Sequence, residues 1–117
     1  MEFDERLGIL RGGNVISSGV EEKTRKVISR LGEHWQIHLT EENGGRMVTH
    51  LAMALARIER GEDIKAPEDN TLAEFRELDV FEKSLEIVND LITWTPINLP
   101  RAEKDYMLVN ICLQLDK

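Results

Sequence analysis

The sequence predicts an all-α protein, a compact bundle of about five helices. Its 117 residues suit one domain. It holds only three prolines and six aromatic residues, whereas good helix formers such as Leu, Glu, Arg and Lys are abundant. Apolar residues recur every three or four positions through most of the chain, and patterns typical of strands are weak.

The first residues already show helical spacing, in Phe3, Leu7 and Leu10, and Gly12 and Gly13 end that pattern. The segment is short. We therefore divide the chain into a short N-terminal segment, residues 1–16, and a single helical domain, residues 17–117.

Two long helices should follow. The first begins near Ser18, because Ser18 and Glu21 have the spacing of a capping box. The second begins between Thr40 and Asn43. Gly61 ends its apolar stripe, which comprises Met47, Val48, Leu51, Ala54, Leu55 and Ile58.

Residues 61–70 are predicted to form a polar loop. Thr71 and Asp79 each have a glutamate three positions on, so they should begin a short helix and a longer one. Pro96 ends the longer helix, and Pro100 fits the first position of a last helix. That helix is apolar nearly all round from Tyr106 to Leu115, which predicts that it is central or lies at a subunit contact.

Composition excludes several classes of function. The formal net charge of −7 disfavours direct binding to nucleic acid, whose phosphates require a surplus of cations. No segment is long and apolar enough for a membrane span, and the N-terminus has no apolar stretch of signal-peptide length. Cys112 is the only cysteine, which suits a reducing compartment. We expect a cytoplasmic protein.

His34 and His38 are the first candidates for chemistry. They are four positions apart, and on a helix this spacing places two imidazoles on one side, as in some metal sites. A third ligand and the His-Glu-x-x-His motif are absent. We expect no metal, no cofactor and no enzymatic activity. A small helical metal-binding protein is a remote alternative.

His50 has a more specific setting. Arg46 precedes it by four residues and Arg57 follows it by seven, so all three share one flank of the predicted helix. A neutral imidazole is a nucleophile toward phosphoryl groups, and nearby arginines would pair with the phosphorylated ring. A histidine at a core boundary beside ordinary surface arginines would give the same pattern.

Two stretches resemble the motifs of the PTS regulation domain, or PRD. The first is His50-Leu51-Ala52-Met53-Ala54-Leu55-Ala56-Arg57-Ile58, and the second contains Leu99-Pro100, Glu103, Tyr106-Met107-Leu108-Val109 and Ile111. The resemblance extends from about Ser18 to Leu115. It implies a helical, dimerising domain of the kind found in bacterial antiterminators and transcription activators, where components of the sugar phosphotransferase system phosphorylate histidines.

This sequence departs from the family in two ways. Asn110 stands where the second motif has its histidine, and an amide cannot take up a phosphoryl group. The short N-terminal segment has no room for the family's usual nucleic-acid-binding domain. The resemblance therefore implies a standalone regulatory module with Asn110 as a degenerate second site.

The leading hypothesis makes His50 the phosphoryl acceptor and Arg46 and Arg57 its supporting cations. The expected partners are a second copy of the chain, a phosphocarrier or sugar permease component of the phosphotransferase system, and a regulator protein. The alternative is a degenerate PRD that serves only for dimerisation or docking.

Overall fold

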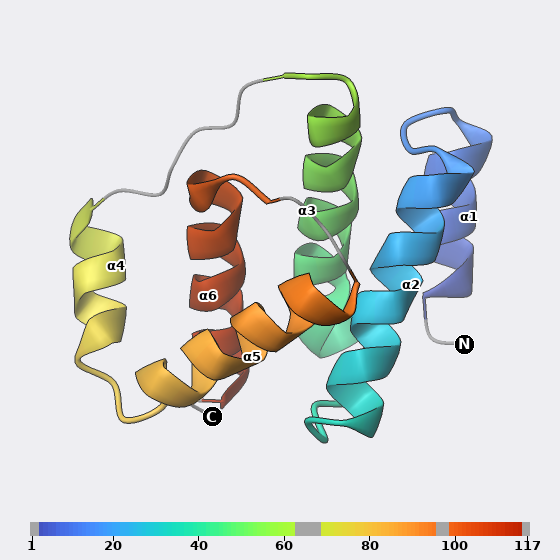
Figure 1. Cartoon of the computed structure of the whole chain (residues 1–117). Helices are drawn as coiled ribbons and strands as arrows, with labels where there is room; N and C mark the ends of the chain where they lie inside the picture. Colours follow the sequence, from blue (N-terminus) through green and yellow to red (C-terminus); the bar gives the residue numbers. More distant parts are fainter. Residues whose placement is uncertain (1–2, 63–68, 96–98, 116–117) are drawn as a thin grey trace. The chain divides into compact units, whose positions relative to one another are not determined.

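The computed structural model describes residues 3–62, 69–95 and 99–115, and only the backbone of residues 69–72 (Figure 1). These residues contain six helices and no strand, so the predicted all-α class is confirmed. The helices group into two units, Met1–Asp63 and Ile64–Lys117, which are described separately. The predicted division at residue 17 stays a prediction.

The first unit consists of α1 (Asp4–Gly12), α2 (Ser18–Glu33) and α3 (Glu41–Glu59). Helix α2 contacts both α1 and α3 (Figure 1). Because the Ser17 hydroxyl donates to Glu59 at 3.0 Å, the start of α2 lies beside the end of α3. The expected N-terminal pattern is thus a full helix, α1, joined to the unit that carries His50.

Helix α2 begins one residue earlier than the capping pattern indicates. The side chain of Ser17, rather than that of Ser18, accepts the hydrogen bond from the Val20 amide, at 3.1 Å. Ser17 and Ser18 carry the same hydroxyl group, so the side chain alone does not choose between them. Ser17 is the cap because its backbone is extended, as the N-cap position requires. At its other end α2 stops at Glu33, before Trp35, and Gln36 adopts a left-handed φ of 60°.

Helix α3 begins where the sequence predicts it. Thr40 is its N-cap, and its hydroxyl accepts from the Asn43 amide at 3.2 Å while the Asn43 side chain accepts from the Thr40 amide at 2.7 Å. This reciprocal pair satisfies two backbone donors that the helix itself cannot use. Gly61, with a φ of 76°, follows the last turn, as predicted.

The buried apolar side chains of the first unit come from all three helices and from the segments between them. The fully buried Phe3 and Leu7 belong to the N-terminal pattern, and the core also includes Ile16, Val20, Val27, Leu31, Leu39, Met47, Val48, Leu51 and Leu55. Burial of this kind, more than helix propensity, is what stabilises short helices such as α1.

The second unit consists of α4 (Asp69–Arg76), α5 (Phe81–Trp94) and α6 (Arg101–Leu115). Helix α6 packs against α4 and α5, in line with the expectation that it is central. One side of α6 is buried through Met107, Leu108, Ile111 and Cys112. Leu113 is 53% exposed, so part of the apolar surface of α6 stays open.

Three predicted helix starts in the second unit were displaced. Helix α4 begins at Asp69, so Thr71 lies inside it. Helix α5 has Val80 as its N-cap without a side-chain bond, so Asp79 is not the cap. Pro100 precedes α6 rather than beginning it, and its carbonyl accepts from the amides of Glu103 and Lys104. Most of the predicted loop at 61–70, and Pro96, lie outside the described residues.

Candidate functional site

Helix α3 carries the three residues that the sequence predicts as a phosphoryl site. Arg46, His50 and Arg57 all lie within its nineteen residues, so the geometry of a continuous helix sets them on one flank. The opposite side of α3 is buried through Val48 and Leu51. The buried side fixes the rotation of the helix and places the flank of His50 at the edge of the core.

The three side chains of this flank differ in solvent exposure. Arg46 is exposed, whereas His50 and Arg57 are half-buried. The Nε2 atom of His50 is buried. His50 is therefore a boundary residue held by its surroundings rather than a freely rotating surface histidine.

The two arginines of this flank differ from most others in the chain. Neither Arg46 nor Arg57 forms an ion pair with any residue that the structure describes. Other guanidinium groups are matched to carboxylates, namely those of Arg6, Arg11, Arg25, Arg60 and Arg101. In a chain of net charge −7, two uncompensated guanidinium groups flanking one histidine form a place where an anionic group would be stabilised.

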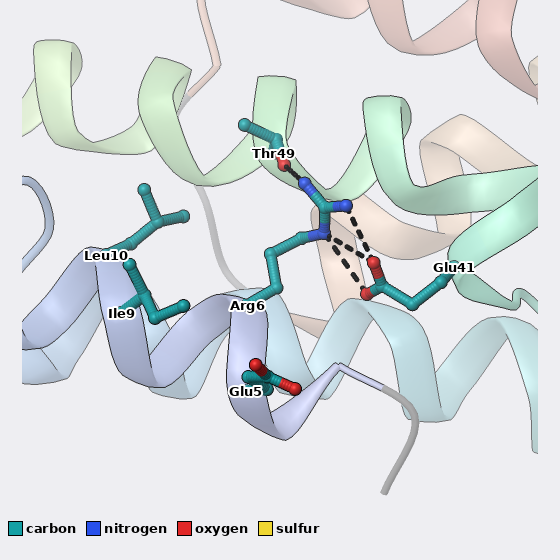
Figure 2. A pocket seen from close by; sticks show the side chains of 6 residues that line it. All are labelled: Glu5, Arg6, Ile9, Leu10, Glu41 and Thr49. Carbon is teal, nitrogen blue, oxygen red and sulfur yellow. Dashed lines mark hydrogen bonds and ion pairs between the residues drawn. The ribbon is translucent and has the colours of Figure 1, made fainter.

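Arg6 fixes α3 near this flank, and sequence reasoning missed it. From α1, its Nε and Nη2 atoms donate to Glu41 at 3.0 and 2.7 Å, and its Nη1 atom donates to Thr49 at 2.7 Å (Figure 2). The guanidinium lies so close to Gly45 that a Cβ atom there would be 3.0 Å from Nη2. Thr49 is the neighbour of His50 in sequence, so Arg6 secures the turn that holds the histidine.

This contact also sets the charge state of its members. The hydrogen bonds from Arg6 hold the pKa of Glu41 below its ordinary value of 4.5, and Glu41 in turn raises the pKa of Arg6. Both groups stay ionised at neutral pH. The glycine pair at positions 44 and 45 was the available sequence signal, since glycine in a helix often marks a close approach of another element.

The second motif lies in the other unit, on α6. The Asn110 side chain donates its Nδ2 proton to the Tyr106 carbonyl at 2.8 Å, four residues earlier in the same helix. Its amide is thus engaged with the backbone, as short polar side chains in helices often are. Glu103, in the first turn of α6, is buried with 3% of its surface exposed. Its burial was not anticipated.

The histidine pair considered for metal binding does not share a helix face. Helix α2 ends at Glu33, and His34 is its C-cap, so His38 lies in the following non-helical segment. The ring of His34 instead packs edge-on against Trp35, with centroids 4.9 Å apart. Among the described residues, no group of three His, Cys, Asp or Glu side chains is placed to hold a metal ion.

Comparison with known proteins adds a family match. The model of the family described as PRD domain matches residues 25–111, a span that contains His50, both arginines and Asn110. Domains of this family are regulatory rather than catalytic. No helix within the described residues has the length and apolar character needed to cross a bilayer.

Two relatives are similar over much of the chain. A protein of Haemophilus influenzae, described as uncharacterized, is 34% identical over 82 residues, which are 70% of this chain and 66% of that protein. The uncharacterized protein YhfY of Escherichia coli is 25% identical over 109 residues, covering 93% of this chain and 91% of its own. No solved structure matches the chain.

Proposed function

Because the chain belongs to the PRD domain family, we propose that it is a regulatory module in which His50 accepts a phosphoryl group from the sugar phosphotransferase system. The donor is a phosphocarrier or a sugar permease component. In the transfer, the bond between phosphorus and the donor breaks and a bond to an imidazole nitrogen of His50 forms. The phosphorylated ring is an anion at neutral pH.

The observation that carries this proposal is the pair of guanidinium groups on the flank of His50. Within the described residues, Arg46 and Arg57 have no carboxylate partner, although acids outnumber bases in the chain by 22 to 15. They are thus available to pair with the incoming donor phosphate and with the product. Electrostatic stabilisation of developing charge is a large part of catalysed phosphoryl transfer.

The proposed output is a change in protein–protein contacts. The net charge of −7 argues against direct binding to nucleic acid, so we assign the regulated step to a transcriptional regulator or antiterminator that the module contacts in the cytoplasm. Self-association belongs to the same proposal. Leu113, with 53% of its surface exposed, and the half-buried Tyr106 and Val109 lie along one flank of α6, which provides an apolar contact surface for a second copy.

Labelling tests the phosphoryl-acceptor role directly. The protein is incubated with the general phosphotransferase proteins, cognate permease components and phosphoenolpyruvate, and we expect one acid-labile phosphoryl group per chain. His50→Ala should abolish the label, whereas His34→Ala and His38→Ala should retain it. Label that survives in His50→Ala would show that another residue is the acceptor.

The supporting role of the arginines needs a matched control. Arg57→Ala should slow labelling while leaving the circular dichroism spectrum and melting temperature nearly unchanged, since Arg57 is only half-buried and pairs with no described carboxylate, and surface changes of this kind usually cost within about 0.5 kcal/mol. Lys26→Ala removes one exposed cation from α2 in the same unit and should label at the wild-type rate. Equal slowing in both variants would attribute the effect to net charge alone.

A second candidate function rests on Asn110. With an amide at this position, held by its own helix, a switch with two phosphorylated histidines is lost. The alternative is therefore a module that serves only for dimerisation or docking. Absence of label on the wild type with several donors, together with retained self-association, would favour it.

A further inference from the structure

A hollow between α1 and α3 is separate from the flank of His50. It has a volume of about 440 Å³, which lies in the range of small-molecule sites. Figure 2 shows the guanidinium of Arg6 reaching across it from α1 toward α3, with Ile9 and Leu10 on one side and Glu41 on the other. Its lining consists of Glu5, Arg6, Ile9, Leu10, Glu41 and Thr49.

One side of the hollow is aliphatic. Ile9 exposes 67% of its surface, the largest fraction among the large apolar side chains that the structure describes as exposed. Leu10 beside it is half-buried. An aliphatic ligand lying on these two side chains would remove apolar surface from water, which is favourable at about 25 cal/mol per Å².

The polar side carries an excess of negative charge. Arg6 is already neutralised by Glu41, which accepts from both Nε and Nη2. Glu5 forms no ion pair with any described residue. The lining thus contains two carboxylates and one guanidinium. An anion would have to displace Glu41 and would be repelled by Glu5, whereas a cation is attracted.

We infer that the hollow binds a small organic cation with an aliphatic body. Its charged group is recognised by the carboxylates of Glu5 and Glu41, and its hydrocarbon part lies on Ile9 and Leu10. Arg6 and Thr49 form the rigid polar end, because their mutual hydrogen bond of 2.7 Å joins α1 to α3. This inference does not depend on phosphorylation of His50.

Two probes that differ only in their charged group test it. Hexylammonium and hexanoate are titrated separately into the isotopically labelled full chain, and amide shifts are followed by nuclear magnetic resonance. We expect saturable shifts with hexylammonium at the amides of Ile9, Leu10 and Thr49, with a dissociation constant of roughly a few millimolar. Hexanoate should cause no saturable shifts there. Higher salt should weaken the hexylammonium effect.

Variants distinguish this site from general attraction of a cation to an acidic protein. Glu5→Gln should weaken hexylammonium binding about threefold, the size expected for one partly screened charge, and Ile9→Ala should weaken it through lost apolar contact. Glu22→Gln removes an exposed carboxylate from α2 and should bind like the wild type. Equal binding of hexanoate, a dissociation constant in Ile9→Ala equal to that of the wild type, or no saturation with hexylammonium would overturn the inference.

Discussion

Gly44 lies in the first turns of α3 directly under Leu39, so replacing it with alanine should strain the contact that begins the helix. A Cβ atom at position 44 would be 2.9 Å from the Cβ atom of Leu39 and 3.0 Å from its Cδ2 atom. The Cβ atom of Leu39 is attached to the backbone and cannot turn aside. Leu39 is also buried, with 7% of its surface exposed, so its side chain has little room to move.

Two terms of opposite sign determine the effect of Gly44→Ala. Alanine stabilises a helix interior by about 1 kcal/mol relative to glycine, and overpacking a filled site costs about 1–3 kcal/mol. The expected result is a net loss of about 0–2 kcal/mol in the free energy of unfolding. For a chain of this size that corresponds to a fall in melting temperature of roughly 4 °C per kcal/mol.

Gly8 provides the matched control because it is also inside a helix of the first unit. A Cβ atom at Gly8 would meet nothing within 4 Å, so Gly8→Ala should gain about 0.5–1 kcal/mol. The difference between the changes in unfolding free energy of the two variants removes the contribution of helix propensity and leaves the cost of overpacking at Gly44. Urea unfolding followed by circular dichroism measures both. The reasoning is refuted if Gly44→Ala is stabilised as much as Gly8→Ala.

Three other predictions concern a cap, a titration and a surface. Thr40→Ala removes the hydroxyl that caps α3 and should cost about 1 kcal/mol in urea unfolding, and a variant as stable as the wild type would contradict the described cap. Because Arg6 lowers the pKa of Glu41, the stability that Glu41 contributes is present above the ordinary pKa of 4.5 and is lost as pH falls through the folded value. The difference in unfolding free energy between wild type and Glu41→Gln should therefore be measurable at neutral pH and vanish in strong acid, and a constant difference would contradict it. Leu113→Glu should shift the chain toward monomer in sedimentation at roughly tens of micromolar, and an unchanged dimer would place the interface elsewhere.

Local patterns predicted the helices best where the deciding groups are close in sequence. Thr40 and Asn43 are three residues apart and cap each other, so the start of α3 was predicted correctly. Ser17 and Ser18 are chemically equivalent, and only the backbone angles decide between them. At Asp79 a capping residue was available, but the helix begins behind Val80 without a side-chain bond.

The site was predicted only as far as one helix determines it. The common flank of Arg46, His50 and Arg57 follows from helical geometry. Arg6 and Glu41 are 35 positions apart in sequence, and the helical periodicity of apolar residues cannot predict an ion pair between them. The glycines at 44 and 45 allow Leu39 and Arg6 to lie close against the backbone of α3, and helical periodicity does not predict those two contacts.

The family match and the first folded unit begin at different residues. The match begins at residue 25, in the middle of α2 (Ser18–Glu33). Phe3 and Leu7, both fully buried, and the cap at Ser17 all precede it. A fragment trimmed to residues 25–111 would begin in the middle of α2 without its N-cap, and it would lack the two side chains that fill the core beside α1. For expression and for grafting onto other proteins, we therefore expect a fragment that starts at Phe3 to be more stable than one cut at the family-model bounds.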